Sequence, residues 1–163
     1  MKYKLLAIIY CALILLASPS YASQQSSVMT APQWIEEIEL SQYKNKVVYL
    51  DFWASWCGPC RKSFPWLNKM QEKYKHRGLV VIGINLDRDI KKAQQFLTKI
   101  PANFLLYSDP TGELGKTYQL QGMPSSYLFD GDGKLSEKHV GFKKSDTDNY
   151  EKNIVKLLEN LKE

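Results

Sequence analysis

Two short segments of the chain are almost continuously apolar, a pattern typical of strands that are covered on both faces. Residues 46–53 read KVVYLDFW and residues 79–86 read LVVIGINL. Both segments are rich in β-branched and aromatic side chains, so each predicts a buried strand. The second is expected to be a central parallel strand, because polar residues hardly interrupt it. A shorter apolar segment at 104–107 predicts a further strand.

Apolar residues spaced three and four apart predict the helices that cover this sheet. One such face, in a helix expected over residues 58–75, is formed by Phe64, Leu67, Met70 and Tyr74. Pro65 lies inside that helix and predicts a kink, because proline removes a backbone hydrogen bond. Shorter helices are expected at 89–100 and 112–118.

The last third of the chain predicts a pair of strands and a closing helix. Residues 125–130 and 134–140 have strand character, and the Gly131-Asp132-Gly133 sequence between them is a hairpin turn signal. The closing helix has one apolar face, formed by Tyr150, Ile154, Leu157, Leu158 and Leu161. Ser145, followed three residues later by Asp148, predicts a side-chain cap at its start. This order of elements predicts an α/β sandwich with a mixed central sheet flanked by helices.

The N-terminus has the three-part pattern of a secretory signal peptide over residues 1–22. A short basic region is followed by an apolar run at 5–17 and by small residues before Ser23, which predicts cleavage near Ala22. Because the run is shorter than the roughly 20 residues that span a bilayer, a cleaved signal is favoured over a permanent anchor. An N-terminal membrane anchor remains the alternative. The chain is therefore expected in the periplasm or otherwise outside the cytoplasm.

Length and charge limit what the remaining chain can be. The polar segment 23–33 predicts a flexible leader, and residues 34–163 are long enough for one domain with its own core. Without Lys2 and Lys4 the chain carries 20 basic and 17 acidic residues, a net charge of +3 from the full chain's +5. Basic and acidic residues are interleaved, so no nucleic-acid partner is expected.

The sequence WASWCGPC at 53–60 carries the chemistry of the chain. Cys11 leaves with the predicted signal peptide, so Cys57 and Cys60 are the two cysteines that remain. Cys57 is expected where a strand passes into a helix N-terminus, whose free N–H groups and dipole stabilise a thiolate. Cys60, three residues on, is then placed to resolve a mixed disulfide formed by Cys57. Gly58 allows another chain to approach, and Pro59 fits the first helical turn.

Two other uses of the cysteine pair are weaker. A metal site needs further ligands, and His76 and His139 do not form a second metal-type cluster, so no metal is expected. A purely structural disulfide that closes so short a loop constrains little chain.

Asp51, in an otherwise apolar strand, has two interpretations. It is either a raised-pKa group that exchanges a proton with Cys60 or a strand-end carboxylate paired with Lys46 or Lys134.

The stretch DFWASWCGPC, together with Gly-Met-Pro before a strand that ends in Asp130, resembles the thioredoxin superfamily over residues 43–161. The resemblance implies a thioredoxin-like three-layer sandwich in which Asp51 is the buried acid below the site. It also implies that Pro124 is a cis-proline facing the disulfide and that Met123 offers its backbone to a substrate. The signal peptide and the long separation between Cys60 and Pro124 resemble the exported TlpA/ResA-like branch. Members of that branch carry an additional helix and strand, here expected at 89–107.

This resemblance implies an exported thiol–disulfide oxidoreductase that reduces protein disulfides, with cytochrome c maturation as a family role. The redox-active Cys57–Cys60 disulfide replaces any separate cofactor, protein thiols are the clients, and a membrane electron donor of the DsbD/CcdA type is implied. We expect a monomer. Trp53, Trp56 and Met123 are candidates for an apolar lip that contacts the client, with Trp56 favoured over Trp53 and Trp66. A disulfide donor and a thioredoxin-like client-binding module are the alternatives.

Overall fold

The computed structural model of the chain describes Trp34 and residues 37–161. The predicted signal peptide at 1–22 and leader at 23–33 lie outside the described residues. Within the described part of the chain, every helix is too short or too polar to cross a membrane.

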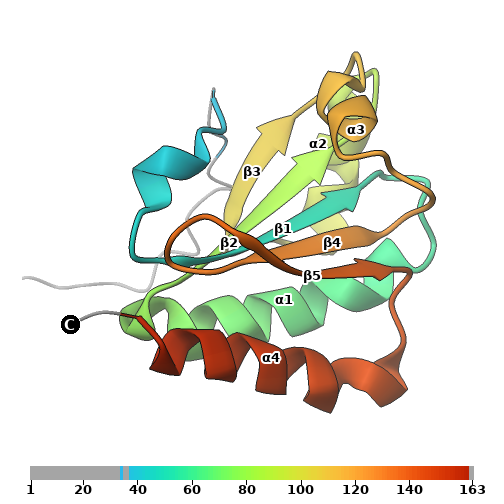
Figure 1. Cartoon of the computed structure of the whole chain (residues 1–163). Helices are drawn as coiled ribbons and strands as arrows, with labels where there is room; N and C mark the ends of the chain where they lie inside the picture. The colour runs from blue at the N-terminus through green and yellow to red at the C-terminus, as the bar shows by residue number, and fades with distance from the viewer. Residues whose placement is uncertain (1–33, 35–36, 162–163) are drawn as a thin grey trace, which may run out of the picture.

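The described chain alternates strands and helices, except for one pair of consecutive strands near its end, as Figure 1 shows. Its elements are β1 Val47–Trp53, α1 Cys60–Tyr74, β2 Leu79–Asn85, α2 Ile90–Lys99, β3 Leu105–Ser108, α3 Glu113–Thr117, β4 Ser125–Phe129, β5 Leu135–Val140 and α4 Thr147–Glu159, with 3-10 turns at Leu40–Tyr43, Lys75–Arg77 and Lys144–Asp146. Each strand and helix expected from the apolar pattern is present, with ends that differ by a few residues.

The five strands form one mixed sheet in the order β3-β2-β1-β4-β5. β1, β2 and β3 are parallel, whereas β4 runs antiparallel to both β1 and β5. The two apolar segments that open the sequence pattern are the central strand β1 and its parallel neighbour β2. All seven side chains of β1 are buried, as expected for a strand that is covered on both faces.

Helices cover both faces of the sheet and give the three-layer α/β sandwich that the sequence predicts. Figure 1 shows α1 and α4 running side by side below the sheet, where Lys73 and Tyr74 of α1 both bind Glu151 of α4. This face holds the larger apolar cluster, which includes the disulfide cysteines. The opposite face holds a second cluster, which is covered by residues of α3 and of the turn Leu40–Tyr43.

Local structure differs from expectation at two helix starts. α1 begins at Cys60, with Pro59 as its N-cap residue, rather than at Gly58. α4 begins at Thr147, and Ser145 donates to Asp146 Oδ1 at 2.8 Å instead of capping the helix. The 3-10 turn Lys144–Asp146 accounts for the second difference, because it places Asp146 rather than Ser145 at the N-cap. The predicted hairpin is present, with Gly133 at φ 78°.

Candidate active site

Cys57 and Cys60 form a disulfide at the junction between β1 and α1, with a Cα–Cα distance of 5.4 Å. Their side chains are nearly inaccessible. Because α1 starts at Cys60, Cys57 lies in the turn that precedes the helix, and its backbone N–H donates to Ala54 O at 3.0 Å. Its Sγ still accepts the backbone N–H of Cys60 at 3.2 Å. A helix N-terminal N–H is therefore already directed at the sulfur that would become a thiolate.

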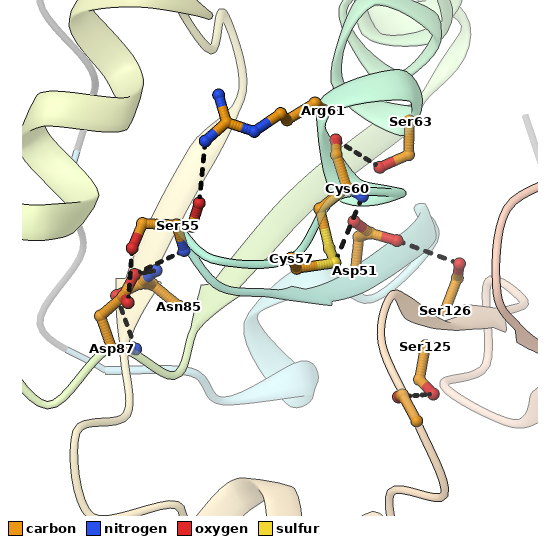
Figure 2. The surroundings of a disulfide bond; sticks show 11 residues. Asp51, Ser55, Cys57, Cys60, Arg61, Ser63, Asn85, Asp87, Ser125 and Ser126 are labelled. Carbon is orange, nitrogen blue, oxygen red and sulfur yellow. Dashed lines mark hydrogen bonds between the residues drawn. A yellow bond between two sulfur atoms is a disulfide. The ribbon is translucent and has the colours of Figure 1, made fainter.

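Asp51 lies inside the sheet, on the face that also holds the disulfide. It is 1% exposed, and it is paired with Ser126 of β4 in the strand register. Ser126 Oγ donates to Asp51 Oδ1 at 3.0 Å, as Figure 2 shows. Oδ2 is buried without a hydrogen-bond partner among the described residues. The interpretation that Asp51 pairs with Lys46 or Lys134 is wrong, because the ion pairs of the described residues include no contact of this carboxylate.

Burial without a compensating cation changes the acidity of Asp51. Desolvation raises the pKa of its carboxyl group from 3.8 to about 7, although the hydroxyl groups of Ser126 and Ser63 lower it in part. The group is therefore able to take or give a proton near neutral pH.

The segment that faces the cysteines across the groove begins at Gly122. The Met123–Pro124 peptide bond is cis, as the family resemblance implies. Ser125 Oγ donates to Gly122 O at 2.7 Å, and Gly141 N–H donates to Pro124 O at 2.7 Å, so both ends of the segment are fixed.

A groove of about 520 Å³ runs along the disulfide. It is lined by Trp56, Cys57, Gly58, Pro59, Leu86, Leu120, Gln121, Gly122 and Met123. Four of the residues predicted to contact a client therefore lie on its wall, namely Trp56, Gly58, Pro59 and Met123. Trp56 has 69% of its surface exposed, which is unusual for a large aromatic side chain.

Trp53 does not belong to this groove. The prediction that it contributes to an apolar lip is wrong, because its side chain is fully buried and packs against Phe64 and Phe96 with ring centroids 4.8 and 4.9 Å apart. The alternation of side chains along β1 explains the difference, since Trp53 shares a face with Asp51 and points into the core. Trp66 packs against Tyr49 and Tyr150 and does not line the groove.

The loop before the disulfide is held by residues that sequence reasoning missed. The Asp87 carboxylate accepts hydrogen bonds from the backbone N–H and the hydroxyl of Ser55, both at 2.8 Å. Asn85 Nδ2 donates to the same carboxylate at 2.8 Å. Figure 2 shows this group beside the cysteine loop. The sequence offers one signal for this group, the Asn-x-Asp pattern at the carboxyl end of β2. Polar residues at that end of a parallel strand are expected near the end of the neighbouring strand β1.

The two histidines lie on different elements of the fold. His76 is exposed in the turn Lys75–Arg77, whereas His139 lies on β5 with its ring centroid 4.6 Å from that of Tyr150. Within the part of the chain that the structure describes, no group of three or more His, Cys, Asp or Glu side chains has the arrangement of a metal site.

Comparison with known proteins places this geometry in a family. The Redoxin family model matches residues 22–154. Over 106 residues the chain is 36% identical to "Thiol-disulfide oxidoreductase ResA" of Bacillus thuringiensis subsp. konkukian, a match that covers 65% of this chain and 61% of the relative. The chain thus matches less than two thirds of the length of the curated relative.

Solved structures resemble the chain over a larger share of their length. One is a candidate thiol:disulfide interchange protein DsbE from Chlorobium tepidum, 48% identical with a TM-score of 0.72, covering 74% of this chain and 86% of that one. Another is a candidate protein disulfide isomerase from Bacteroides thetaiotaomicron, 27% identical with a TM-score of 0.69, covering 76% and 80%. The chain belongs to the Redoxin family, and the resemblance to the TlpA/ResA-like branch of the thioredoxin superfamily is confirmed.

Proposed function

We propose that this chain is a thiol–disulfide oxidoreductase that reduces disulfides in other proteins. The observation that carries the proposal is the Cys57–Cys60 disulfide at the start of a helix, beside a groove open to a client. The names of the similar proteins support it, since they are described as thiol–disulfide oxidoreductase and thiol:disulfide interchange protein.

The reaction follows from the order of the two cysteines. In the reduced protein, the Cys57 thiolate attacks one sulfur of the client disulfide, the client S–S bond breaks, and its other sulfur leaves as a thiolate that takes up a proton. Cys60 then attacks Cys57 Sγ of the mixed disulfide and releases the second client thiol. Two electrons pass to the client, and the Cys57–Cys60 disulfide forms.

Asp51 supports the second step. Cys60 must lose its proton before it can attack, and a carboxyl group with a pKa of about 7 in the same buried layer can accept that proton. Its unpartnered Oδ2 is the atom available to do so. When a donor reduces the disulfide again, Asp51 returns the proton to Cys60.

The client is proposed to lie in the groove as an extended segment. Trp56 supplies exposed apolar surface on one side, and Met123 supplies backbone groups on the other, next to Pro124. Gly58 leaves this approach open, since a Cβ built there meets no atom within 4 Å.

Location and partners complete the proposal. We propose export by the N-terminal signal, a monomeric protein without a separate cofactor, and reduction by a membrane donor of the DsbD/CcdA type. Cytochrome c maturation is the proposed process, because a haem attachment site contains two closely spaced cysteines that must be reduced.

The test is the reduction potential of the Cys57–Cys60 pair, measured by equilibrating the protein with glutathione buffers. A value near thioredoxin, about −270 mV, supports a reductase, whereas a value near DsbA, about −120 mV, contradicts it and favours a disulfide donor. Reduction of an oxidised Cys-x-x-Cys-His peptide then tests the proposed client. Cys57→Ser abolishes turnover in a reductase, while full retained function would favour the client-binding module.

A further inference from the structure

The turn that carries Cys57 is held from two sides by oppositely charged residues. On one side, Asp87 is 3% exposed and accepts three hydrogen bonds, two from Ser55 and one from Asn85. All three donors are neutral, and the Asp87 backbone N–H is itself bonded to Asn85 Oδ1 at 3.1 Å. The carboxylate is therefore fixed to the end of β2, and it fixes Ser55 in turn.

On the other side, Arg61 binds the same residue. Its Nη2 donates to Ser55 O at 3.2 Å, and its guanidinium lies 5.3 Å from the centre of the Phe96 ring. Figure 2 shows Ser55 between the two charged side chains. The N–H of Ser55 thus points at an anion and its carbonyl at a cation, so the loop backbone has one preferred orientation.

This arrangement matters most when the disulfide is open. In the oxidised protein the S–S bond itself keeps Cys57 against α1. After reduction that bond is absent, and Cys57 Sγ stays at the Cys60 N–H only if the turn that carries Cys57 keeps its place. The contacts of Ser55, two residues before Cys57, provide this constraint.

We propose that Asp87 is a positioning residue for Cys57, which acts through Ser55 and Arg61 to keep the reduced sulfur at the helix N-terminus. The inference rests on the proposed function, since the position of Cys57 matters only if that sulfur exchanges. Asp87 itself touches neither the cysteines nor the groove in the contacts described. Its effect on Cys57 is therefore transmitted by the loop.

The proposal and a direct electrostatic effect of the Asp87 charge predict opposite changes in the reactivity of Cys57. A nearby anion disfavours a thiolate, so the charge alone would make Cys57 less reactive, and removing it would make Cys57 more reactive. Positioning predicts the reverse, because losing the hydrogen bonds to Ser55 frees the turn and withdraws the sulfur from the Cys60 N–H.

Two substitutions at one position separate these effects. Asp87→Ala removes both the charge and the hydrogen bonds, whereas Asp87→Asn removes the charge but can still accept from Ser55 N–H and donate to its hydroxyl. The readout is the rate of iodoacetamide alkylation of Cys57 in the fully reduced protein as a function of pH. This measurement needs no client, so it remains interpretable if reductase activity is not found.

We expect Asp87→Ala to lower the alkylation rate constant at acidic pH by about two- to fivefold, the size of a helix-terminus charge effect. Asp87→Asn is expected to recover at least half of that loss. Unchanged or faster alkylation in Asp87→Ala, or a loss in Asp87→Asn as large as that in Asp87→Ala, would overturn the proposal.

A second pair of variants keeps the test valid if Asp87→Ala does not fold. Arg61→Gln removes the cation that binds Ser55, and Lys62→Gln removes the adjacent exposed cation, which has no such contact. A loss of alkylation rate at least twice as large in Arg61→Gln supports the proposal, and equal losses overturn it. Where Asp87→Ala folds, the loss of alkylation rate that it causes should be at least halved when Arg61→Gln is already present. If the losses from the two substitutions simply add, the two residues do not act together through Ser55, and the proposal is overturned.

Discussion

Replacing Asp51 with asparagine is expected to stabilise the oxidised protein at alkaline pH. The folded-state pKa of Asp51 is about 7, against an ordinary value of 3.8, so the folded state holds this proton more tightly than the unfolded chain. The tighter binding of this proton contributes its full amount to the free energy of unfolding below pH 3.8, and the contribution is lost as the pH rises through 7. Each pH unit between these two pKa values is worth 1.36 kcal/mol, so the free energy of unfolding of the wild-type protein falls by about 4 kcal/mol. The asparagine variant does not ionise and has no such loss.

The assay is urea unfolding of the oxidised wild-type and Asp51→Asn proteins at several pH values between 4 and 8. The difference in the free energy of unfolding should grow by about 4 kcal/mol across this range in favour of the variant. Asp148→Asn replaces an exposed carboxylate in the first turn of α4 and is the matched control, which should show no gain in stability over the wild-type protein as the pH rises. A difference for Asp51→Asn that is flat with pH, or that grows in favour of the wild-type protein, would refute the reasoning.

Three further substitutions test the hydrogen bond to Asp51, the groove and the packing of the sheet below the site. Ser126→Ala removes the hydrogen bond to Asp51 Oδ1 and should move the stability loss about one pH unit further to the alkaline side, measured by the same urea series. Trp56→Ala should raise KM for a protein client about fivefold, in steady-state assays, while the reduction potential stays unchanged, because the side chain lies on the groove and not at the sulfurs. Gly83→Ala should destabilise the fold by about 1–3 kcal/mol in denaturant unfolding, since the new Cβ lies 3.0–3.1 Å from three buried side chains, including Trp53.

The fold was predictable because its main signals are local in the sequence. Two apolar segments specify the central strands, and helical periodicity specifies α1 and α4. The position of Cys57 between a strand and a helix follows from the same pattern. The predictions failed at the helix starts, where neighbouring residues compete for the N-cap position. Before α4, the 3-10 turn places Asp146 at the N-cap instead of the predicted Ser145. Such differences depend on a single hydrogen bond and leave no periodic signal.

The polar neighbours of the site were not predictable, because they come from strands that are distant in sequence. Ser126 reaches Asp51 across 75 positions, through the pairing of β4 with β1. Asp87 reaches Ser55 across 32 positions, through the parallel pairing of β1 with β2. A lone serine or aspartate in the sequence does not reveal its cross-strand partner. The prediction that Trp53 contacts a client failed inside a well-predicted element, because a strand that is buried on both faces shows no alternation of apolar and polar residues.

The two buried carboxylates of the site differ in how their charges are satisfied, and this difference predicts opposite mutational effects. Asp51 accepts one hydrogen bond and keeps an unpartnered oxygen, whereas Asp87 accepts three. Removing an unsatisfied charge relieves a cost, while removing the acceptor of three buried donors leaves those donors unpaired.

Asp87→Ala should therefore destabilise the oxidised protein by about 1–3 kcal/mol at pH 8, where Asp51→Asn stabilises it. Asp87→Asn should lie between the alanine variant and wild type, because its amide can still bond Ser55. Urea unfolding of all three variants in one buffer measures the contrast. If Asp87→Ala were as stable as the wild-type protein, Ser55 would be held without it, and a site with one proton-exchanging acid and one position-holding acid would no longer follow from the geometry.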